Sequence, residues 1–218
     1  MGRSAESYAP ETKPTGSGLT GGFGGPGARK QGRDRDMQRL NSVDPASASG
    51  KTKELLDFVM QRTGRIPNMV RMMANSPAAL GGYLNLAGAL ADSTLSPTVR
   101  DSVAILVAAD GESDYTLAAV CALARKGGLG DDDIAAAQRA HARDPGTAAA
   151  LRFSENLLEK RGHVSASEVD ELMEAGFTDG EVAEIVAAVV LNIYRNYFNL
   201  VAGPEIDFPL VNKSTAVA

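Results

Sequence analysis

Residues 178–202 read TDGEVAEIVAAVVLNIYRNYFNLVA, and this stretch predicts the longest helix of the chain. It opens with Thr178 and Glu181 at the spacing of a capping box, in which each side chain bonds the other residue's backbone N–H. Residues 185–191 are almost wholly apolar. We therefore expect a central helix over 179–202 that is buried on most of its sides.

The helical period continues outward from this stretch, and no segment alternates as a strand would. Ser96-Pro97 supplies an N-cap followed by proline at the first helical position, and Ser165 with Glu168 repeats the capping box. The pattern predicts an all-α fold of about nine helices. We expect them to lie near residues 51–63, 69–75, 77–92, 97–109, 113–126, 131–142, 146–160, 166–175 and 179–202.

The composition changes near residue 50. Residues 1–50 contain ten of the 23 glycines and four of the ten prolines, with almost no apolar periodicity. Such a segment buries too little surface to offset its ordering entropy, so we predict a disordered tail over 1–50 and a helical domain over 51–218.

The charge and composition argue against several classes of binding partner. The net charge of −5 divides into about +2 on the tail and −7 on the rest, and an acidic body argues against nucleic-acid binding. No run of about 18 apolar residues lacks a polar or charged break, so we expect no membrane span and a cytoplasmic protein. Because there is one cysteine and no histidine pair at i, i+4, we expect no metal and no cofactor. Cys121 lies among apolar residues and is predicted to be buried and inert.

Three segments carry a resemblance to a known family. Segment 64–77 contains Gly-Arg-Ile-Pro-Asn-Met-Val-Arg and ends in Asn-Ser-Pro. Segment 95–109 contains Leu-Ser, Arg-Asp and Val-Ala-Ala, and segment 196–209 contains Asn-Tyr-Phe-Asn-Leu-Val-Ala and Glu-Ile-Asp-Phe-Pro. In order and spacing they resemble the AhpD-like (alkylhydroperoxidase D) and carboxymuconolactone decarboxylase-like proteins over about residues 52–210. The resemblance implies an all-helical bundle that forms homo-oligomers.

The resemblance also places the family's redox motif on residues that cannot perform its chemistry. Family peroxidases carry a glutamate, a Cys-x-x-Cys pair twelve residues later and a histidine four residues beyond the pair; here these positions are Asp101, Ser113, Thr116 and Val120. Peroxide reduction by that route needs a thiolate that becomes a sulfenic acid and a second thiol that resolves it. We therefore expect no thiol peroxidase activity.

Two functions from different classes remain. The first is a cofactor-free proton-transfer enzyme (isomerase, decarboxylase or lyase) acting on a small organic substrate. In it Asp101 is the general acid or base, and Ser113, Tyr115 and Thr116 are catalytic hydrogen-bond donors that orient the substrate. The second is a non-catalytic structural or ligand-binding homo-oligomer whose tail docks a protein partner.

The asparagines of the 179–202 helix bear on this choice. Asn192, Asn196 and Asn199 are spaced i, i+4, i+7 on one face. They form either a substrate-binding wall of a cavity shared with Asp101, which favours the enzyme, or hydrogen bonds between helices or subunits, which favour the non-catalytic protein.

Overall fold

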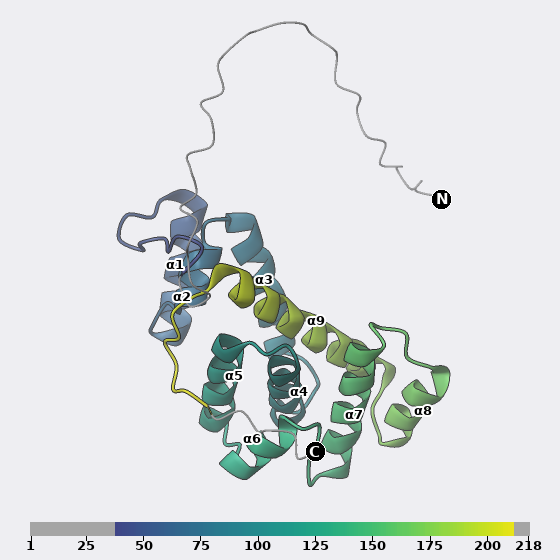
Figure 1. Ribbon diagram of the computed structural model, residues 1–218. Helices are drawn as coiled ribbons and strands as arrows, with labels where there is room; N and C mark the ends of the chain where they lie inside the picture. Colours follow the sequence, from purple (N-terminus) through teal and green to yellow (C-terminus); the bar gives the residue numbers. More distant parts are fainter. Residues whose placement is uncertain (1–37, 212–218) are drawn as a thin grey trace, which may run out of the picture. The chain divides into compact units, whose positions relative to one another are not determined.

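The computed structural model describes residues 38–211, and this part of the chain contains nine α-helices and no strand (Figure 1). The predicted all-α fold is confirmed, and the observed boundaries agree closely with those expected except in the sixth helix, which ends at Ala137 and not at residue 142. The helices are α1 (Gly50–Thr63), α2 (Asn68–Met73), α3 (Pro77–Ala91), α4 (Pro97–Asp110), α5 (Asp114–Lys126), α6 (Asp131–Ala137), α7 (Pro145–Glu159), α8 (Ala166–Glu174) and α9 (Asp179–Ala202).

Side-chain caps fix where most of these helices begin. Ser96 and Ser113 each accept a hydrogen bond from the backbone N–H three residues later. Ser165 and Thr178 form the two predicted capping boxes, with both reciprocal bonds present. Each cap pairs N–H groups that would otherwise have no partner at the first turn.

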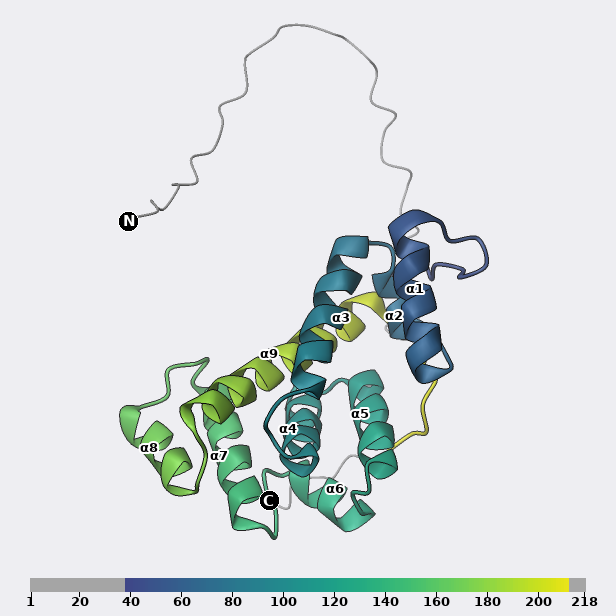
Figure 2. The same cartoon turned by 180° about the vertical axis from the view of Figure 1, so that it is seen from behind.

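Two long helices, α4 and α9, organise the core. Helix α4 is buried along most of its length and packs against α5, α6, α7 and α9. Helix α9 runs from beside α8 to beside α2, and it contacts α3, α4, α5 and α7 on the way (Figures 1 and 2). It therefore joins the first three helices to the rest of the body.

Helix α9 differs from the expectation that it is buried on most sides. Its inward face is buried, but Val186, Val190 and Tyr197 are exposed on the opposite face. By length and composition alone α9 is apolar enough to cross a membrane, with 44% of its most apolar stretch buried. The inward face explains much of that hydropathy, because a core helix passes the same test.

The folded body begins before residue 50. The backbone N–H groups of Arg39 and Leu40 both bond the Ala202 carbonyl at the end of α9, at 2.8 and 3.2 Å. The N–H of Val43 bonds the Arg71 carbonyl, and the Arg71 guanidinium bonds the Val43 carbonyl in return. Residues 38–49 thus pack on α9 and α2, whereas the tail was predicted to extend to residue 50. The rest of that predicted tail, residues 1–37, lies outside the described residues.

Candidate functional site

The hairpin of α4 and α5 brings two of the predicted site residues together. Ser113 is the N-cap of α5, and Thr116 lies one turn along the helix. Their hydroxyl oxygens, Ser113 Oγ and Thr116 Oγ1, are 2.8 Å apart, and both residues are almost fully buried, at 2% and 1% exposure. The two hydroxyls therefore satisfy each other rather than facing solvent.

Helix α9 completes this hydroxyl pair. The Asn199 side-chain amide donates to Thr116 Oγ1 at 3.0 Å, and Asn199 is itself 4% exposed. The result is a buried polar chain from Asn199 through Thr116 to Ser113. We call these three residues the hydroxyl cluster. It links α9 to α5, so it is an interhelical contact built from neutral polar groups.

One turn earlier, Asn196 links α9 to α4. Its amide nitrogen donates to the Val107 carbonyl at 2.7 Å. The side chain lies against Gly111, where the ideal Cβ position would be only 2.2 Å from Asn196 Nδ2. Gly111 has an ordinary φ of −77°, so glycine is needed here for space and not for backbone conformation.

Two amide oxygens in this region have no partner. Asn196 Oδ1 and Asn199 Oδ1 are buried without a hydrogen bond among the described residues. A buried polar atom without a partner costs about 1–3 kcal/mol. These oxygens can accept a hydrogen bond from a small donor, but no charged group accompanies them.

Asn192, the third asparagine, belongs to a different group. Its amide donates to the Ala188 carbonyl of its own helix, and its Oδ1 accepts from Arg195 at 3.0 Å. Arg195 also donates to the Tyr83 hydroxyl and lies 5.4 Å from the centre of that ring. The three asparagines therefore do not line one wall.

Asp101 lies away from the hydroxyl cluster. It sits in the second turn of α4, seven residues before Ala108, whose carbonyl bonds the Ser113 N–H. That separation is about 10 Å along the helix axis. Asp101 Oδ2 instead faces the end of α5, 3.2 Å from the ideal Cβ position of Gly127. No hydrogen bond or ion pair joins Asp101 to another residue within 38–211.

The surroundings of Asp101 favour its neutral form. Burial raises the pKa of the carboxyl, against the opposing positive charges of Arg100 and Arg195. Arg100 is adjacent in the chain but is engaged elsewhere, because it donates to the Leu90 and Ala91 carbonyls at the end of α3. Arg100 therefore makes no ion pair with Asp101.

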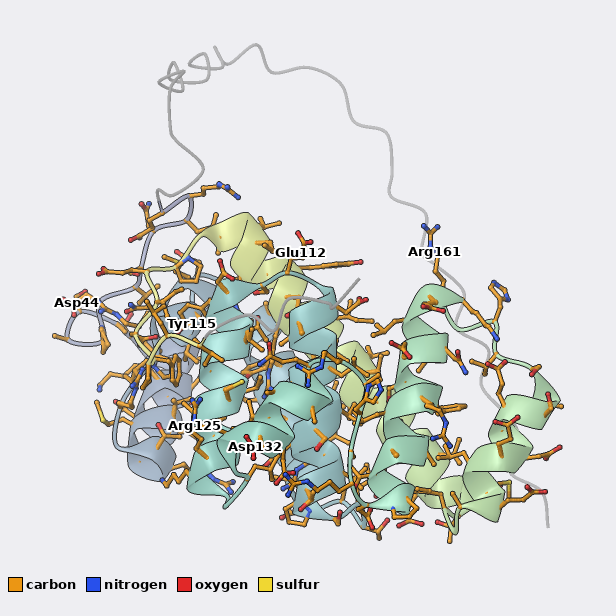
Figure 3. All side chains as sticks on the ribbon, turned by 60° about the horizontal axis from the view of Figure 1, so that its bottom comes forward. Asp44, Glu112, Tyr115, Arg125, Asp132 and Arg161 are labelled. Carbon is orange, nitrogen blue, oxygen red and sulfur yellow. The ribbon has the colours of Figure 1, made fainter. Side chains whose placement is uncertain are left out.

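Tyr115, which Figure 3 labels on α5, contacts the C-terminal segment through Asp207 and Phe208. Its hydroxyl donates to Asp207 Oδ1 at 2.6 Å and accepts from the Met69 backbone N–H at 3.1 Å. Its ring meets Phe208 edge-to-face. Burial and the Asp207 hydrogen bond raise the pKa of Tyr115 well above its usual range. Its hydroxyl is thus already used within the fold.

Asp207 was not among the predicted site residues, although it holds this end of the molecule together. Its carboxylate pairs with Arg65 at 2.6 Å and accepts the N–H of Asn68, the first residue of α2. It therefore caps α2, whose own preceding residue, Pro67, provides no side-chain cap. Arg65 and Asp207 are 142 positions apart, so no local sequence signal could have paired them.

The other reactive or metal-binding side chains of the described residues do not form a cluster. Cys121 is fully buried, and burial raises the pKa of its thiol to about 11, as the apolar sequence around it predicts. Among residues 38–211 no three His, Cys, Asp or Glu side chains are grouped as a metal site. A small hollow between α7 and α8, lined by Arg152, Phe153 and Glu171, contains none of the predicted site residues.

Comparison with known proteins finds matches by structure and none by sequence. No family model matches the chain, and no curated protein matches it. Among solved structures, an AhpD-core, peroxidase-related protein from Ralstonia eutropha matches with a TM-score of 0.69 at 21% identity, over 78% of this chain and 92% of that one. A peroxidase-related protein from Silicibacter matches with a TM-score of 0.68 at 17% identity, over 86% and 98%.

A third match is a debrominase. A cysteine-to-alanine variant of Bmp8, in complex with 2,3,4-tribromopyrrole, matches with a TM-score of 0.66 at 18% identity, over 79% of this chain and 94% of that one. Identities this low establish a common fold.

Proposed function

This chain has the AhpD-like fold, and from that premise we propose that it is a non-catalytic subunit which assembles with copies of itself and has no thiol peroxidase activity. The observation that carries the proposal is the hydroxyl cluster. The resemblance aligns Ser113 and Thr116 with a redox cysteine pair, and here both side chains are buried and hydrogen-bonded into a contact with α9.

The chemistry of the cluster supports a structural role. A hydroxyl cannot form the sulfenic acid and disulfide that thiol-based peroxide reduction requires. Cys121 does not replace the missing pair, because it is fully buried with a pKa near 11 and therefore carries little thiolate at neutral pH. A resolving cysteine is also lacking, since the chain contains only one.

The predicted acid–base set is dispersed as well. General acid–base catalysis needs the acid or base within hydrogen-bond reach of the group it serves. Asp101 faces the end of α5, Tyr115 is committed to Asp207, and the hydroxyl cluster lies near the other end of α4. This dispersal favours the non-catalytic alternative over a proton-transfer enzyme built on these residues together.

A hydroperoxide assay tests the proposal. The full chain is incubated with cumene hydroperoxide and dithiothreitol, beside a Cys121→Ala variant and a buffer blank. We expect both proteins to consume peroxide at the rate of the blank. Turnover by the wild type that disappears in Cys121→Ala would show a working thiol and overturn the proposal.

A second candidate function rests on Asp101 alone. Its carboxyl is half-buried, has a raised pKa and makes no hydrogen bond among the described residues. These properties are common in proton-transfer groups. If this group serves a substrate, Asp101→Asn abolishes binding or turnover of a small organic ligand and leaves the fold intact. Because Bmp8 binds a brominated pyrrole, 2,3,4-tribromopyrrole is a suitable first probe, with binding measured by calorimetry on both proteins.

A further inference from the structure

The outward face of α9 carries an apolar stripe that the other described residues leave largely exposed. Five of its large apolar side chains are exposed, of which Tyr197 at 66% and Val201 at 62% are the most exposed. Together with the partly buried Ile193 they recur at helical spacing and so form one row. We define the α9 stripe as Val186, Val190, Ile193, Tyr197, Leu200 and Val201.

The stripe contains no charge. It runs over residues 186–201, which is about 22 Å of helix. Arg195 is the sole charged residue between positions 185 and 204, and it points to the other side, where it bonds Tyr83 and Asn192. Glu184, at the beginning of this region, is held by Thr94. A continuous apolar row of this length marks an interaction surface, whereas singly exposed apolar residues do not.

We propose that the α9 stripe is the surface through which two copies of this chain associate, with their α9 helices packed antiparallel across a two-fold axis near Ile193. This inference rests on the self-association in the proposed function and names the surface that performs it. In a two-fold interface each position meets its symmetry counterpart. An axis at the middle of the stripe places Val190 opposite Tyr197 of the partner subunit.

The sizes of the side chains favour the antiparallel direction. The first half of the exposed face has small residues, namely Ala183, Val186 and Val190, whereas the second half has Tyr197 and Leu200. Antiparallel packing brings the small half of one copy against the large half of the other. Parallel packing would oppose tyrosine with tyrosine and leave gaps between the valines, and gaps at a contact lose dispersion energy.

The helix dipoles agree with the same direction. Antiparallel α9 helices oppose their two dipoles favourably, whereas parallel helices would align them.

A charge placed in the stripe tests the surface. Val190→Glu and the control Leu123→Glu, which changes a 56% exposed residue on α5, are made in the full chain. Both are compared with wild type by sedimentation velocity over a concentration series, and circular dichroism confirms their folding. We expect wild type and Leu123→Glu to be dimers or larger. Val190→Glu should weaken association about 100-fold, because its carboxylate would be buried unpaired.

The other outcomes are distinguishable. If Val190→Glu associates as wild type does, the α9 stripe is the wrong surface, although self-association stands. If wild type is monomeric, self-association and the stripe both fail. If deleting residues 1–37 creates a dimer from a monomer, the occupant is the chain's own N-terminal segment. If wild type binds phosphatidylcholine–phosphatidylglycerol vesicles through Val190, the occupant is a membrane.

Disulfide formation tests the direction of packing. Val190→Cys and Tyr197→Cys proteins, one of them carrying an affinity tag, are mixed and oxidised with copper phenanthroline. The wild type, whose Cys121 is fully buried, is the control. We expect a cross-link between the two different variants and little within either alone. A Val190→Cys protein that cross-links efficiently to itself would overturn the antiparallel arrangement.

Discussion

In the C-terminal half of α9, the usual pattern of a surface helix is reversed: polar side chains face inward and apolar side chains face outward. Asn192, Asn196 and Asn199 are buried there, whereas Tyr197 and Val201 are exposed. The inward amides bond α4, α5 and their own helix, and the outward row is largely exposed within residues 38–211. The comparison indicates that polar groups on this helix fix how it sits on its neighbours. Under our proposal, the outward apolar groups bind a second copy of the chain.

This difference also supports the proposal that the hydroxyl cluster has a structural role. A catalytic group is exposed to its substrate, and the exposed side of α9 has apolar side chains and the Tyr197 phenol, with no charged group beside them. The buried side has hydroxyls and amides that are used for packing. The hydrogen bonds of this network favour one arrangement of the helices, although Asn196 Oδ1 and Asn199 Oδ1 have no partner among the described residues.

The largest loss of stability should come from a substitution that fills space at the inward face of α9. Gly111→Ala places a methyl group where Asn196 Nδ2 lies, so the amide must leave the Val107 carbonyl. We expect the free energy of unfolding to fall by about 3 kcal/mol in urea titrations. The matched control is Gly82→Ala in α3, where nothing lies within 4 Å of the added carbon and a gain of up to about 1 kcal/mol is expected. Equal effects at the two glycines would contradict the role given to Asn196.

The next largest loss of stability should come from removing a buried polar contact away from α9. Tyr115→Phe removes the hydroxyl that donates to Asp207 and leaves the buried Met69 N–H without a partner. We expect a loss of about 2 kcal/mol of unfolding free energy. Proteolysis of residues 204–211 should become faster, because these contacts hold that segment on α5. Wild-type stability and cleavage would show that Tyr115 does not anchor it.

The sequence predicted these features unevenly. Caps such as Ser96, Ser113 and Thr178 act within one turn, so the helices could be placed from the sequence. The contacts Asn199–Thr116 and Tyr115–Asp207 span 83 and 92 positions, and no local pattern encodes them. Helical periodicity indicates that a helix has an apolar face, but it does not show whether that face lies against the core or is exposed. For that reason the apolar character of α9 predicted burial on most sides and missed the exposed stripe.

Substitution of Asp101 should give a small gain in stability. Because burial raises its pKa in the folded state, the folded protein holds the proton more tightly than the unfolded chain does. The carboxyl therefore lowers stability as pH rises above its unfolded pKa of about 3.9. We expect Asp101→Asn to be slightly more stable than wild type at pH 7 and to lose that advantage near pH 3.5. A loss of stability at pH 7 would reveal a partner for the carboxylate.

The most direct test of the central claim is a double-mutant cycle between Thr116 and Asn199. Unfolding free energies are measured for wild type, Thr116→Val, Asn199→Ala and the double variant, and the difference isolates the energy of their contact. We predict a coupling of about 1 kcal/mol, because the 3.0 Å hydrogen bond between them is buried and joins α5 to α9. If the two substitutions are instead additive, the hydroxyl cluster does not hold these helices together and its structural role is contradicted.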